Sequence, residues 1–457
     1  MSDFSLQSYV AEKKSIHLVG IGGVSMSALA ELLLHLGAKI TGSDRAQSAV
    51  TDKLTALGIQ ITYAHLPENV EGADLVIRTA AVHDENPEIA RAHELNIPVI
   101  ERAQAWGSIM LAYKNAVCVA GTHGKTTTTS MLTLIGMQCG IDPTVMVGSN
   151  LPAIGGTLRI GAHDCFIAES CEYTNSFLSF HPTVAVILNV DADHLDFFKD
   201  IDDIIHSFHE FCKLVPETGA LVVNHDSENA LKAIEGIDRK YITFGSTAEA
   251  DVYPENVTDR DGYYSFDVLY QGEQYTHVDL SVPGYHNMLN ALASCGVCIF
   301  LGLDAASAAE GLAQFTGSSR RFQTTGHMPN GAMVIDDYAH HPTEMAATLR
   351  TAREMDYDRI ICVFQPHTYS RTKALLSEFI EALKLCDKAI LADIYAARER
   401  NTYGISSKDI ADAIDGAEYY TSFDEIEARL KEIAQPRDLI ITMGAGNVNE
   451  IGPKLCK

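Results

Sequence analysis

Short apolar runs rich in valine and isoleucine recur along the chain, and longer apolar or amphipathic stretches separate many of them. Residues 15–20 (SIHLVG) predict the first β-strand, which runs into a glycine-rich turn. An apolar helix follows the turn and ends at Gly37, and residues 38–44 predict a second strand. Strand, turn, helix and strand in this order are typical of a parallel α/β unit, so the pattern predicts an α/β fold.

The same alternation continues to the end of the chain. Residues 250–282 instead alternate apolar and polar side chains and contain turns at Asp261-Gly262 and Gln271-Gly272, which predicts an antiparallel appendage. Residues 144–157 are rich in glycine and predict a loop suited to gripping a substrate. We expect a helix at residues 86–95 and further strands at residues 73–82, 96–102, 164–170, 183–190, 221–225, 332–338, 359–366, 388–394 and 438–446.

The most informative stretch is residues 116–132 (AVCVAGTHGKTTTTSML), where an apolar strand meets a tight turn and a helix start. The turn and the helix start consist of Gly121, Thr122, His123, Gly124, Lys125 and Thr126. Backbone N–H groups in such a loop, together with the positive end of the helix, attract an anion. Lys125 would reach the outer phosphates of a nucleotide, and the Thr126 hydroxyl can ligand Mg²⁺. The first glycine, Gly121, stands two positions later than in G-x-x-x-x-G-K-[ST], so the phosphate loop is expected to be tighter.

The first glycine turn, residues 20–27 (GIGGVSMS), predicts a second anion site at the start of its helix. Asp44 ends the following strand, where an acid commonly meets the ribose of a bound nucleotide. Ser25 replaces the third glycine of G-x-G-x-x-G. NAD is therefore one candidate, a different nucleotide held through its pyrophosphate and ribose fits equally well, and a Rossmann-like fold without a ligand is the third possibility.

Polar residues that follow predicted strands give a further signal. Glu169 ends one predicted strand, and His194 follows another. Ligands bind beyond the carboxyl ends of strands in an open parallel sheet, so Glu169, His194 and Thr126 are expected to converge. Oxygen ligands suit Mg²⁺ bound with nucleotide phosphates, and a histidine is a less usual member of such a set. The runs at residues 336–342 (DDYAHHP) and 365–371 (QPHTYSR) also stand at strand ends, where they either face a ligand or serve the structure.

Two further polar clusters leave their interpretation open. Residues 284–290 (GYHNMLN) open an apolar helix, and Asn287 and Asn290 would either cap this helix or recognise adenine. Arg320 and Arg321 stand side by side in an acidic protein. A guanidinium group suits a phosphate oxygen, whereas the alternative is a surface salt bridge.

Length and composition limit the possible functions. The 457 residues are too many for one ordinary core, so about two to four domains are expected. The chain has 34 Lys and Arg against 60 Asp and Glu, and its formal charge of −26 opposes binding to nucleic acid or anionic membranes. Ten cysteines form no disulfide framework, so we interpret Cys295 and Cys298, which lie in an apolar run, as buried thiols in a reducing compartment. There is no signal-peptide pattern and no apolar run of roughly 18 residues, so a cytoplasmic location is expected.

These motifs together are similar to those of the Mur ligases, which are ATP-dependent, amide-forming enzymes of peptidoglycan precursor synthesis. The resemblance covers nearly the whole chain and rests on GIGGVSMS, GTHGKTTTT, ESCEYTNSFL, LNVDADHLD, GYHNMLN, SSRRFQ, DDYAHHPTE, QPHTYSRT and MGAGN. The G-T-x-G-K-T-T form is typical of a superfamily that includes the folylpolyglutamate synthetases. GIGG-x-x-MS and D-Y-A-H-H-P-T point to the branch that joins L-alanine to UDP-N-acetylmuramate.

The resemblance implies an α/β fold with three domains. Residues 1–113 would form a Rossmann-like domain that binds the UDP-sugar. Residues 114–317 would form the central ATP-binding domain, with a P-loop ATPase-like parallel sheet and the antiparallel appendage. Residues 318–457 would form a second Rossmann-like domain that binds the amino acid. Mg²⁺ would be the cofactor and ATP a co-substrate.

The resemblance also assigns residues to roles. The ATP set would be Gly121, Thr122, His123, Gly124, Lys125, Thr126, Thr127, Asn287, Asn290, Arg321 and Asp337. The UDP-sugar set would be Gly22, Gly23, Val24, Ser25, Met26, Ser27, Asp44 and Thr79. The alanine pocket would be bordered by His340, His367 and Arg371, while Thr368 replaces an arginine of many relatives. Thr126 and Glu169 would ligand one Mg²⁺ and His194 a second Mg²⁺, and the catalytic set would be Lys125, Glu169, His194, Arg321 and His340.

In the reaction that the resemblance implies, the lactate carboxylate of UDP-N-acetylmuramate attacks the γ-phosphate of ATP and gives an acyl phosphate. The amine of L-alanine then attacks the acyl carbon, and phosphate leaves. His340 or the substrate phosphate would accept the amine proton. The alternatives are a recycling ligase that adds a peptide to the same sugar nucleotide, a nicotinamide-dependent dehydrogenase and a nucleotide-gated binding protein. The oligomeric state stays open.

Overall fold

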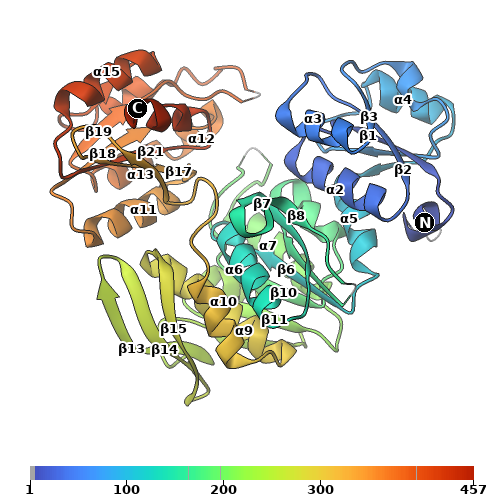
Figure 1. Cartoon of the computed structure of the whole chain (residues 1–457), viewed down its shortest axis with the longest axis horizontal. Helices are drawn as coiled ribbons and strands as arrows, with labels where there is room; N and C mark the ends of the chain where they lie inside the picture. The colour runs from blue at the N-terminus through green and yellow to red at the C-terminus, as the bar shows by residue number, and fades with distance from the viewer. Residues whose placement is uncertain (1–5, 163, 196, 398) are drawn as a thin grey trace. The chain divides into compact units, whose positions relative to one another are not determined.

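The computed structural model describes residues 6–162, 164–195, 197–397 and 399–457. The chain divides into two compact units, each of which is described by itself. Unit 1 comprises the chain up to Gly121 together with Gly136–Val190 and Ile205–Ile242, and unit 2 comprises Thr122–Ile135, Asp191–Ile204 and Thr243–Lys457. Helices alternate with strands in three sheet-bearing regions, so the predicted α/β class is confirmed (Figure 1).

The first sheet lies in unit 1 and is a parallel, Rossmann-like sheet in the order β3-β2-β1-β4-β5. Its elements are α1 (Leu6–Ala11), β1 (Ser15–Val19), α2 (Val24–His35), β2 (Lys39–Ser43), α3 (Ala49–Ala56), β3 (Gln60–Thr62), η1 (Pro67–Val70), β4 (Leu75–Arg78), α4 (Pro87–Glu94), β5 (Val99–Glu101) and α5 (Arg102–Met110). The strand order reverses between β1 and β4, and the glycine turn after β1 stands at this ligand-binding switch point. The strand predicted at residues 73–82 is shorter than expected, because pairing with β5 ends at Arg78 and a turn follows at Thr79.

Unit 1 also holds the strands that lead to the phosphate loop, in the order β11-β10-β6-β9-β7-β8. They are β6 (Asn115–Ala120), β7 (Thr144–Leu151), β8 (Gly156–Arg159), β9 (Cys165–Glu169), β10 (Val184–Ile187) and β11 (Ala220–Asn224), with η2 (Pro152–Ile154), η3 (Tyr173–Ser179) and α8 (Glu228–Ile234) in the connections. Neighbouring strands of this set are parallel, except that β8 runs antiparallel to β7. The elements α7 (Ile201–Lys213) and β12 (Lys240–Phe244) contribute residues to both units.

The prediction of a loop at residues 144–157 is wrong, because β7 and β8 occupy most of this stretch. Gly148 lies in β7, and a Cβ atom at this position would stand 2.6 Å from the Glu169 carboxylate. The glycine therefore lets a neighbouring side chain approach the strand instead of breaking it. The turn between the two strands is made at Gly155, whose φ of +66° is the left-handed conformation that glycine tolerates.

Unit 2 contains the helix that follows the phosphate loop, α6 (Lys125–Gln138), as far as Ile135. The predicted antiparallel appendage is confirmed and consists of β13 (Val252–Arg260), β14 (Tyr263–Tyr270) and β15 (Glu273–Pro283). Two helices follow it, α9 (Tyr285–Leu301) and α10 (Ala305–Ala313). Cys295 and Cys298 are buried in α9, as the sequence predicts, and no cysteine of the described chain forms a disulfide.

The last sheet is a second Rossmann-like sheet, in the order β16-β17-β21-β18-β19-β20, and only β16 is antiparallel to its neighbour. Its elements are β16 (Gln323–His327), β17 (Met333–Asp337), α11 (Pro342–Glu354), β18 (Arg359–Phe364), α12 (Tyr369–Ala374), α13 (Leu376–Leu383), β19 (Lys388–Leu391), α14 (Ser407–Ala411), β20 (Glu418–Tyr419), α15 (Phe423–Ile433), β21 (Asp438–Met443), η4 (Val448–Glu450) and α16 (Gly452–Leu455). Met345 and Phe379 pack on one face of the sheet, and Ile426 and Leu455 pack on the other. Helices therefore cover both faces (Figure 1).

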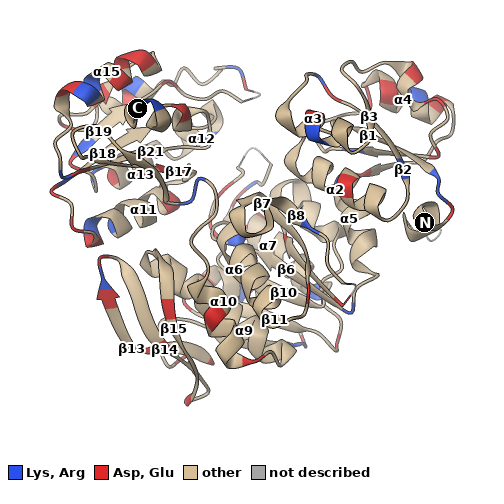
Figure 2. Cartoon of the chain, viewed as in Figure 1, with Lys and Arg blue, Asp and Glu red and all other residues tan. Residues whose placement is uncertain are grey.

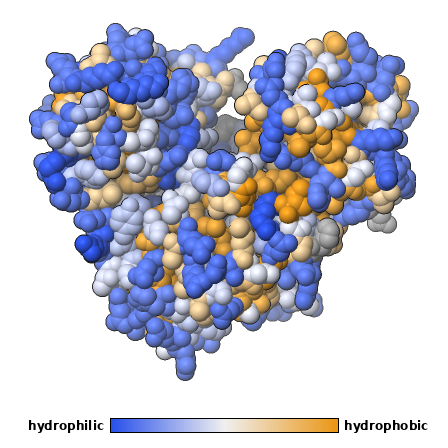
Figure 3. Space-filling view, in the orientation of Figure 1, coloured by the Kyte–Doolittle hydropathy of each residue, from blue (hydrophilic) through white to orange (hydrophobic). Residues whose placement is uncertain are grey.

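Acidic side chains outnumber basic ones and occur in every part of the chain (Figure 2). Hydrophilic residues cover much of the face in Figure 3, while apolar residues gather over α2, where Val24 is half exposed. Among the described residues, no helix has the length and apolar composition that a membrane crossing requires.

Candidate active site

The phosphate loop has the strand–turn–helix geometry that the sequence predicts. Strand β6 ends at Ala120, and Gly121 follows with φ of +147°, where a Cβ atom would stand 2.9 Å from the Leu188 Cβ atom. Gly124 has φ of +83°, and Lys125 is the first residue of α6. Both glycines are therefore required by the backbone, and the positive end of α6 opens onto the loop.

Side chains within unit 2 fix the shape of this loop. The Lys125 ammonium donates a hydrogen bond to the Thr122 carbonyl oxygen at 3.0 Å, so the lysine folds back over the loop. The Thr122 hydroxyl in turn accepts a hydrogen bond from the Asp191 N–H at 2.9 Å. Thr126 and Thr127 are buried in the first turn of α6. A cation and several N–H groups are therefore held where a triphosphate would be bound.

His123 is the charged centre of the loop. Its Nε2 atom lies 3.4 Å from Oδ2 of Asp191, and its Nδ1 atom lies 3.2 Å from Oε1 of Glu344. Burial opposes protonation of the imidazole, but the two carboxylates outweigh burial and raise the pKa of His123 to about 9. The side chain is therefore an imidazolium at neutral pH.

Glu344 connects the loop with two other parts of unit 2, the start of α11 and Arg321. One carboxylate oxygen, Oε2, accepts the backbone N–H of His340 at 3.1 Å and that of His341, the N-cap of α11, at 3.4 Å; the second bond completes a capping box. Its other oxygen, Oε1, faces His123 and lies 3.7 Å from Nη1 of Arg321. Burial would raise the pKa of Glu344, but His340, His123 and Arg321 hold this pKa well below its usual range.

The sequence analysis assigned no role to Glu344. The available signal was the run H-P-T-E before a helical stretch, which marks a capping box and so fixes where Glu344 stands. Only the folded chain shows that the oxygen facing away from the cap meets His123 and Arg321.

The predicted alanine-site residues lie together in unit 2. The rings of His340 and His367 are 5.8 Å apart, and Nδ1 of His367 is 3.2 Å from Nη1 of Arg371. Burial lowers the pKa of each histidine to about 4, so both rings are neutral at pH 7. Nδ1 of His340 lies 3.0 Å from the Tyr338 carbonyl oxygen, which can only accept. The proton therefore sits on Nδ1, and Nε2 carries the free electron pair.

Arg371 is already engaged by Asp193, a residue to which the sequence analysis gave no role. Two of its guanidinium nitrogens, Nε and Nη2, lie 3.1 and 2.9 Å from the same Asp193 oxygen. Burial would raise the pKa of Asp193, but Arg371 lowers it strongly. His194 follows directly, with φ of +53° and its Nε2 atom 3.7 Å from the other Asp193 oxygen. An amino-acid carboxylate would therefore have to share the Arg371 guanidinium with Asp193.

The asparagines predicted to cap a helix or to face adenine join two helices. Asn287 donates to the Pro283 carbonyl at 2.7 Å, and Asn290 donates to the Asn287 side chain at 3.2 Å. The Asn290 oxygen accepts the Thr128 hydroxyl at 3.2 Å, which joins α9 to α6. The polar cluster therefore fixes the phosphate-loop helix.

The two neighbouring arginines have different surroundings. Arg320 pairs with Asp336 at 2.8 Å and donates to the Gly444 carbonyl at 2.6 Å, so it holds the last sheet together. Both guanidinium groups stand over the Tyr338 ring, but Arg321 approaches Glu344 instead of Asp336. Asp337 accepts two backbone N–H groups, and burial raises its pKa to about 6 although Arg321 opposes the shift. Asp337 therefore shapes the chain around Arg321.

The predicted UDP-sugar turn lies in unit 1. The Gly22 N–H donates to Oδ2 of Asp44 at 2.8 Å, and a Cβ atom on Gly20 would meet the Thr79 side chain at 2.9 Å. Helix α2 begins at Val24 without a side-chain cap, so its first N–H groups face outward from the turn. The Ser25 hydroxyl accepts the Trp106 indole N–H at 3.0 Å. The turn therefore offers backbone donors beside an acid, which suits a pyrophosphate and a ribose.

Glu169 also lies in unit 1, at the carboxyl end of β9 and in register with Val119 of β6. Its Oε2 atom accepts the Gly148 N–H at 2.7 Å. The described residues contain no group of three or more His, Cys, Asp and Glu side chains placed to hold a metal ion. Mg²⁺ with a nucleotide usually takes one or two protein oxygens, and the phosphates and water supply the remainder, so the Thr126 hydroxyl and the Glu169 carboxylate fit its chemistry. Their convergence with His194, which unit 2 carries, stays a prediction.

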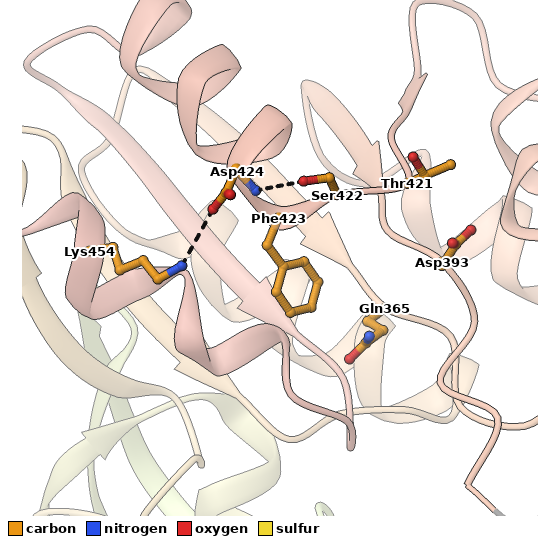
Figure 4. A pocket seen from close by; sticks show the side chains of 7 residues that line it. All are labelled: Gln365, Asp393, Thr421, Ser422, Phe423, Asp424 and Lys454. Atoms are coloured by element: carbon orange, nitrogen blue, oxygen red, sulfur yellow. Dashed lines mark hydrogen bonds and ion pairs between the residues drawn. The ribbon is translucent and has the colours of Figure 1, made fainter.

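A cavity of about 360 Å³ opens beyond the carboxyl ends of β18 and β19 (Figure 4). It is lined by Gln365, Asp393, Thr421, Ser422, Phe423, Asp424 and Lys454. Lys454 lies 3.7 Å from Asp424 across it. None of the residues predicted for ATP, UDP-sugar or alanine lines this cavity, so it is separate from the predicted sites.

Comparison with known protein families accounts for the order of these sites. Residues 15–114 match the Mur ligase family catalytic domain, residues 119–298 match the Mur ligase middle domain, and residues 320–446 match the Mur ligase glutamate ligase domain. The chain belongs to the Mur ligase family. This family consists of ATP-dependent, amide-forming enzymes, so the assignment as an enzyme is confirmed.

Two curated Mur ligases illustrate how near the relatives are. The UDP-N-acetylmuramate--L-alanine ligase of Agathobacter rectalis is 50% identical over 448 residues, which cover 97% of both chains. The enzyme of the same name from Caldanaerobacter subterraneus is 49% identical over 446 residues, or 96% of this chain and 97% of that one.

Solved structures of Mur ligases agree with this fold. The UDP-N-acetylmuramate-alanine ligase of Thermotoga maritima aligns with a TM-score of 0.81 at 30% identity and covers 97% of this chain and 98% of its own. A murein peptide ligase from Psychrobacter arcticus aligns with a TM-score of 0.71 at 23% identity, with coverage of 97% and 98%, and shares the fold.

Proposed function

We propose that this chain is the ATP-dependent ligase that joins L-alanine to the lactate carboxylate of UDP-N-acetylmuramate in peptidoglycan precursor synthesis. The observation that carries the proposal is the Glu344 bridge, which links the phosphate-loop residue His123 with His340 of the predicted alanine site. The Glu344 carboxylate thus contacts both the phosphate loop and the predicted alanine site within unit 2. Relatives about half identical over nearly the full length carry the same activity in their names.

The three predicted domains have separate tasks in this proposal. Residues 1–113 bind the UDP-sugar at the glycine turn after β1. Residues 114–317 bind ATP at the loop after β6, and residues 318–457 bind L-alanine beside the two neutral histidines. The UDP-sugar and ATP are both anions, so the protein has to hold like charges together in an acidic chain.

Positive groups within unit 2 compensate for this repulsion. The loop itself carries the His123 imidazolium, and the Lys125 ammonium follows it directly. Arg321 lies near Glu344, the carboxylate that also faces His123. Thr126, Glu169 and His194 would hold Mg²⁺, which when bound screens the charge of the triphosphate and of the transferring phosphoryl group. No covalent enzyme nucleophile is needed, because the chemistry rests on orientation and charge compensation.

The reaction then proceeds in two displacements. The lactate carboxylate attacks the γ-phosphorus of ATP, ADP leaves and an acyl phosphate forms. The alanine amine attacks the acyl carbon and expels phosphate. His340 presents an unprotonated Nε2 atom with its Nδ1–H fixed on the Tyr338 carbonyl, so it is suited to accept the amine proton. The substrates ATP and a UDP-sugar are compatible with a cytoplasmic location.

The alternatives have less support. A recycling ligase that adds a peptide to the same sugar nucleotide has weaker support, because the murein peptide ligase of Psychrobacter arcticus is 23% identical and is informative about the fold alone. A nicotinamide-dependent dehydrogenase does not need a lysine and a threonine at the start of α6. A binding protein gated by nucleotide needs no amino-acid site.

Phosphate release separates these possibilities. It is measured with UDP-N-acetylmuramate and ATP fixed, while L-alanine, glycine, L-serine or the tripeptide of the recycling reaction is varied. We expect release that requires the sugar nucleotide and L-alanine together and that L-alanine supports best. Release that the tripeptide supports better than L-alanine would favour the recycling ligase, and release without any amine acceptor would contradict a ligase.

A further inference from the structure

Arg102 is a partly buried arginine without an ion pair. It is the first residue of α5, and the carboxylate beside it in sequence, Glu101, instead lies 3.8 Å from Arg78. Within the described chain, no carboxylate lies within ion-pairing distance of Arg102, and its guanidinium makes no hydrogen bond. Burial lowers the pKa of Arg102 below its usual range. The charge is therefore desolvated, and neither an ion pair nor a hydrogen bond among the described residues compensates for the lost hydration.

This position is unfavourable in three respects. A cation at the first residue of a helix opposes the helix dipole, which favours negative charge there. A buried charge without a partner is costly. The chain also has 60 acidic against 34 basic residues, so partners for a free arginine are abundant. A guanidinium kept under these conditions indicates an anion that the free protein lacks.

Other arginines of the described chain follow the ordinary rule. Each one that is at least partly buried has a carboxylate or carbonyl partner, namely Arg78, Arg91, Arg159, Arg239, Arg320, Arg321, Arg359, Arg371 and Arg429. Arg102 is the exception within the residues that the structure describes.

The surroundings of Arg102 locate the missing anion. Trp106 stands one turn further along α5, on the same face, and its indole N–H donates to Ser25 of the glycine turn at 3.0 Å. The Trp106 ring is also 5.9 Å from the Phe166 ring of β9. The face of α5 that carries Arg102 therefore lies between the predicted pyrophosphate turn and the strand that ends at Glu169.

A second contact supports the same placement. Arg102 interacts electrostatically with Cys171, which stands two residues beyond Glu169. Helix α5 packs closely on η3, the segment after Cys171, because a Cβ atom on Gly107 would stand 1.8 Å from the Ser179 carbonyl oxygen. Arg102 thus stands on a rigid element of unit 1, beside the path from the glycine turn to the end of β9.

We infer that Arg102 binds an oxyanion of the sugar-nucleotide substrate with its guanidinium fork. Two groups of that substrate have the required chemistry, the lactate carboxylate that reacts and the pyrophosphate that anchors it. A planar guanidinium donates two parallel hydrogen bonds to either group. The inference rests on the proposed function, because it takes UDP-N-acetylmuramate as the ligand.

Calorimetric titration of the full chain tests this inference. The probes are UDP-N-acetylmuramate, UDP-N-acetylglucosamine, which lacks the lactate carboxylate, and UDP. The variants are Arg102→Met, Arg102→Lys and the control Arg91→Met. The control removes an ion-paired arginine from helix α4, which belongs to the same Rossmann-like region of unit 1. We expect Arg102→Met to weaken UDP-N-acetylmuramate binding by about 10- to 100-fold, Arg102→Lys to weaken it less, and Arg91→Met to leave it unchanged.

The probes distinguish the two anions. A loss confined to UDP-N-acetylmuramate assigns Arg102 to the lactate carboxylate, and an equal loss for all three probes assigns it to the pyrophosphate. Unchanged binding of all three probes to Arg102→Met would overturn the inference. Failure of the unaltered protein to bind UDP-N-acetylmuramate would instead overturn the proposed function.

Thermal unfolding without ligand separates binding from a structural role. A ligand-binding Arg102 is unfavourable in the free protein, so Arg102→Met should unfold at the same temperature as the unaltered chain or at a higher one. A clear drop in the unfolding temperature of Arg102→Met, together with loss of binding, would show that the residue is structural.

Discussion

The chain contains two glycine turns that join a strand to a helix, and they differ in what surrounds the turn. After β1, the Gly22 N–H is bonded to the Asp44 carboxylate, and the helix that follows is mainly apolar. After β6, the loop carries Lys125 and an imidazolium held by two carboxylates. The backbone geometry attracts an anion in both places, but only the second turn also supplies positively charged side chains for a reacting phosphate. The first is suited to binding and the second to chemistry.

The largest expected effect comes from removing the lysine of the second turn. Lys125→Ala should lower the rate of ADP formation by about a thousand-fold or more, since the charge that stabilises the transferring phosphoryl group is lost. Binding of UDP-N-acetylmuramate, which uses the first turn, should be unchanged. ADP release by a coupled assay and calorimetry with the sugar nucleotide measure the two effects. Loss of sugar-nucleotide binding in this variant would show that the two turns are not independent.

The second expected effect concerns the bridge between loop and alanine site. Glu344→Gln keeps a side chain that can complete the capping box of α11 but removes the charge facing His123 and Arg321. We expect kcat to fall by about 10- to 100-fold, with a smaller effect on the sugar-nucleotide Kd. Steady-state kinetics in all three substrates measure this change. An unaltered kcat would mean that Glu344 only caps the helix.

A smaller effect is expected at the first turn. In Gly22→Ala, the new Cβ atom would stand 2.9 Å from Oδ2 of Asp44, so the turn and the acid have to separate. UDP-N-acetylmuramate binding should weaken by about 10-fold while ATP binding is retained. Gly156→Ala is the matched control, because a Cβ atom there meets no atom within 4 Å. Equal effects of the two substitutions would contradict the role of the turn.

The smallest effects concern the pH dependence of stability. The phosphate loop, through His123, should respond at alkaline pH, and helix α4 beside the first sheet, through Glu88, should respond at acid pH. The folded pKa of His123, about 9, is above its ordinary 6.5, so its stabilising contribution is complete below pH 6.5 and is lost as the pH rises through 9. Burial opposes ionisation of Glu88, but His17, Asn69, Ser43 and His65 lower its pKa to about 2, so its contribution is present above pH 4.5 and is lost as the pH falls through 2.

Unfolding free energies measured across pH test this difference. Each contribution amounts to at most about 3 kcal/mol. The variant His123→Asn should flatten the alkaline limb of the profile, and Glu88→Gln should flatten the acid limb. If His123→Asn leaves the alkaline limb as steep as in the unaltered chain, the imidazolium assignment is wrong.

The fold could be predicted to a large extent because apolar runs and glycine turns are local signals. The wrong loop prediction at residues 144–157 shows the limit. In the sequence, Gly148 indicates a loop, whereas in the structure it lies in a strand and the Glu169 carboxylate occupies the space that a side chain would need. The phosphate loop, the histidines and Asp44 are marked by motifs. Glu344 and Asp193 are not, because their roles depend on partners that are distant in sequence, such as His123 and Arg371.

The central proposal is that the lactate carboxylate of the bound sugar nucleotide attacks the γ-phosphate of ATP at the phosphate loop. The most direct test is to follow the transfer of oxygen from this carboxylate to phosphate. UDP-N-acetylmuramate labelled with ¹⁸O in both oxygens of its lactate carboxylate is converted with ATP and L-alanine, and the released phosphate is analysed by mass spectrometry. An acyl phosphate requires that every released phosphate carries one ¹⁸O atom and that the amide product keeps the other. Unlabelled phosphate would contradict direct attack of this carboxylate on ATP.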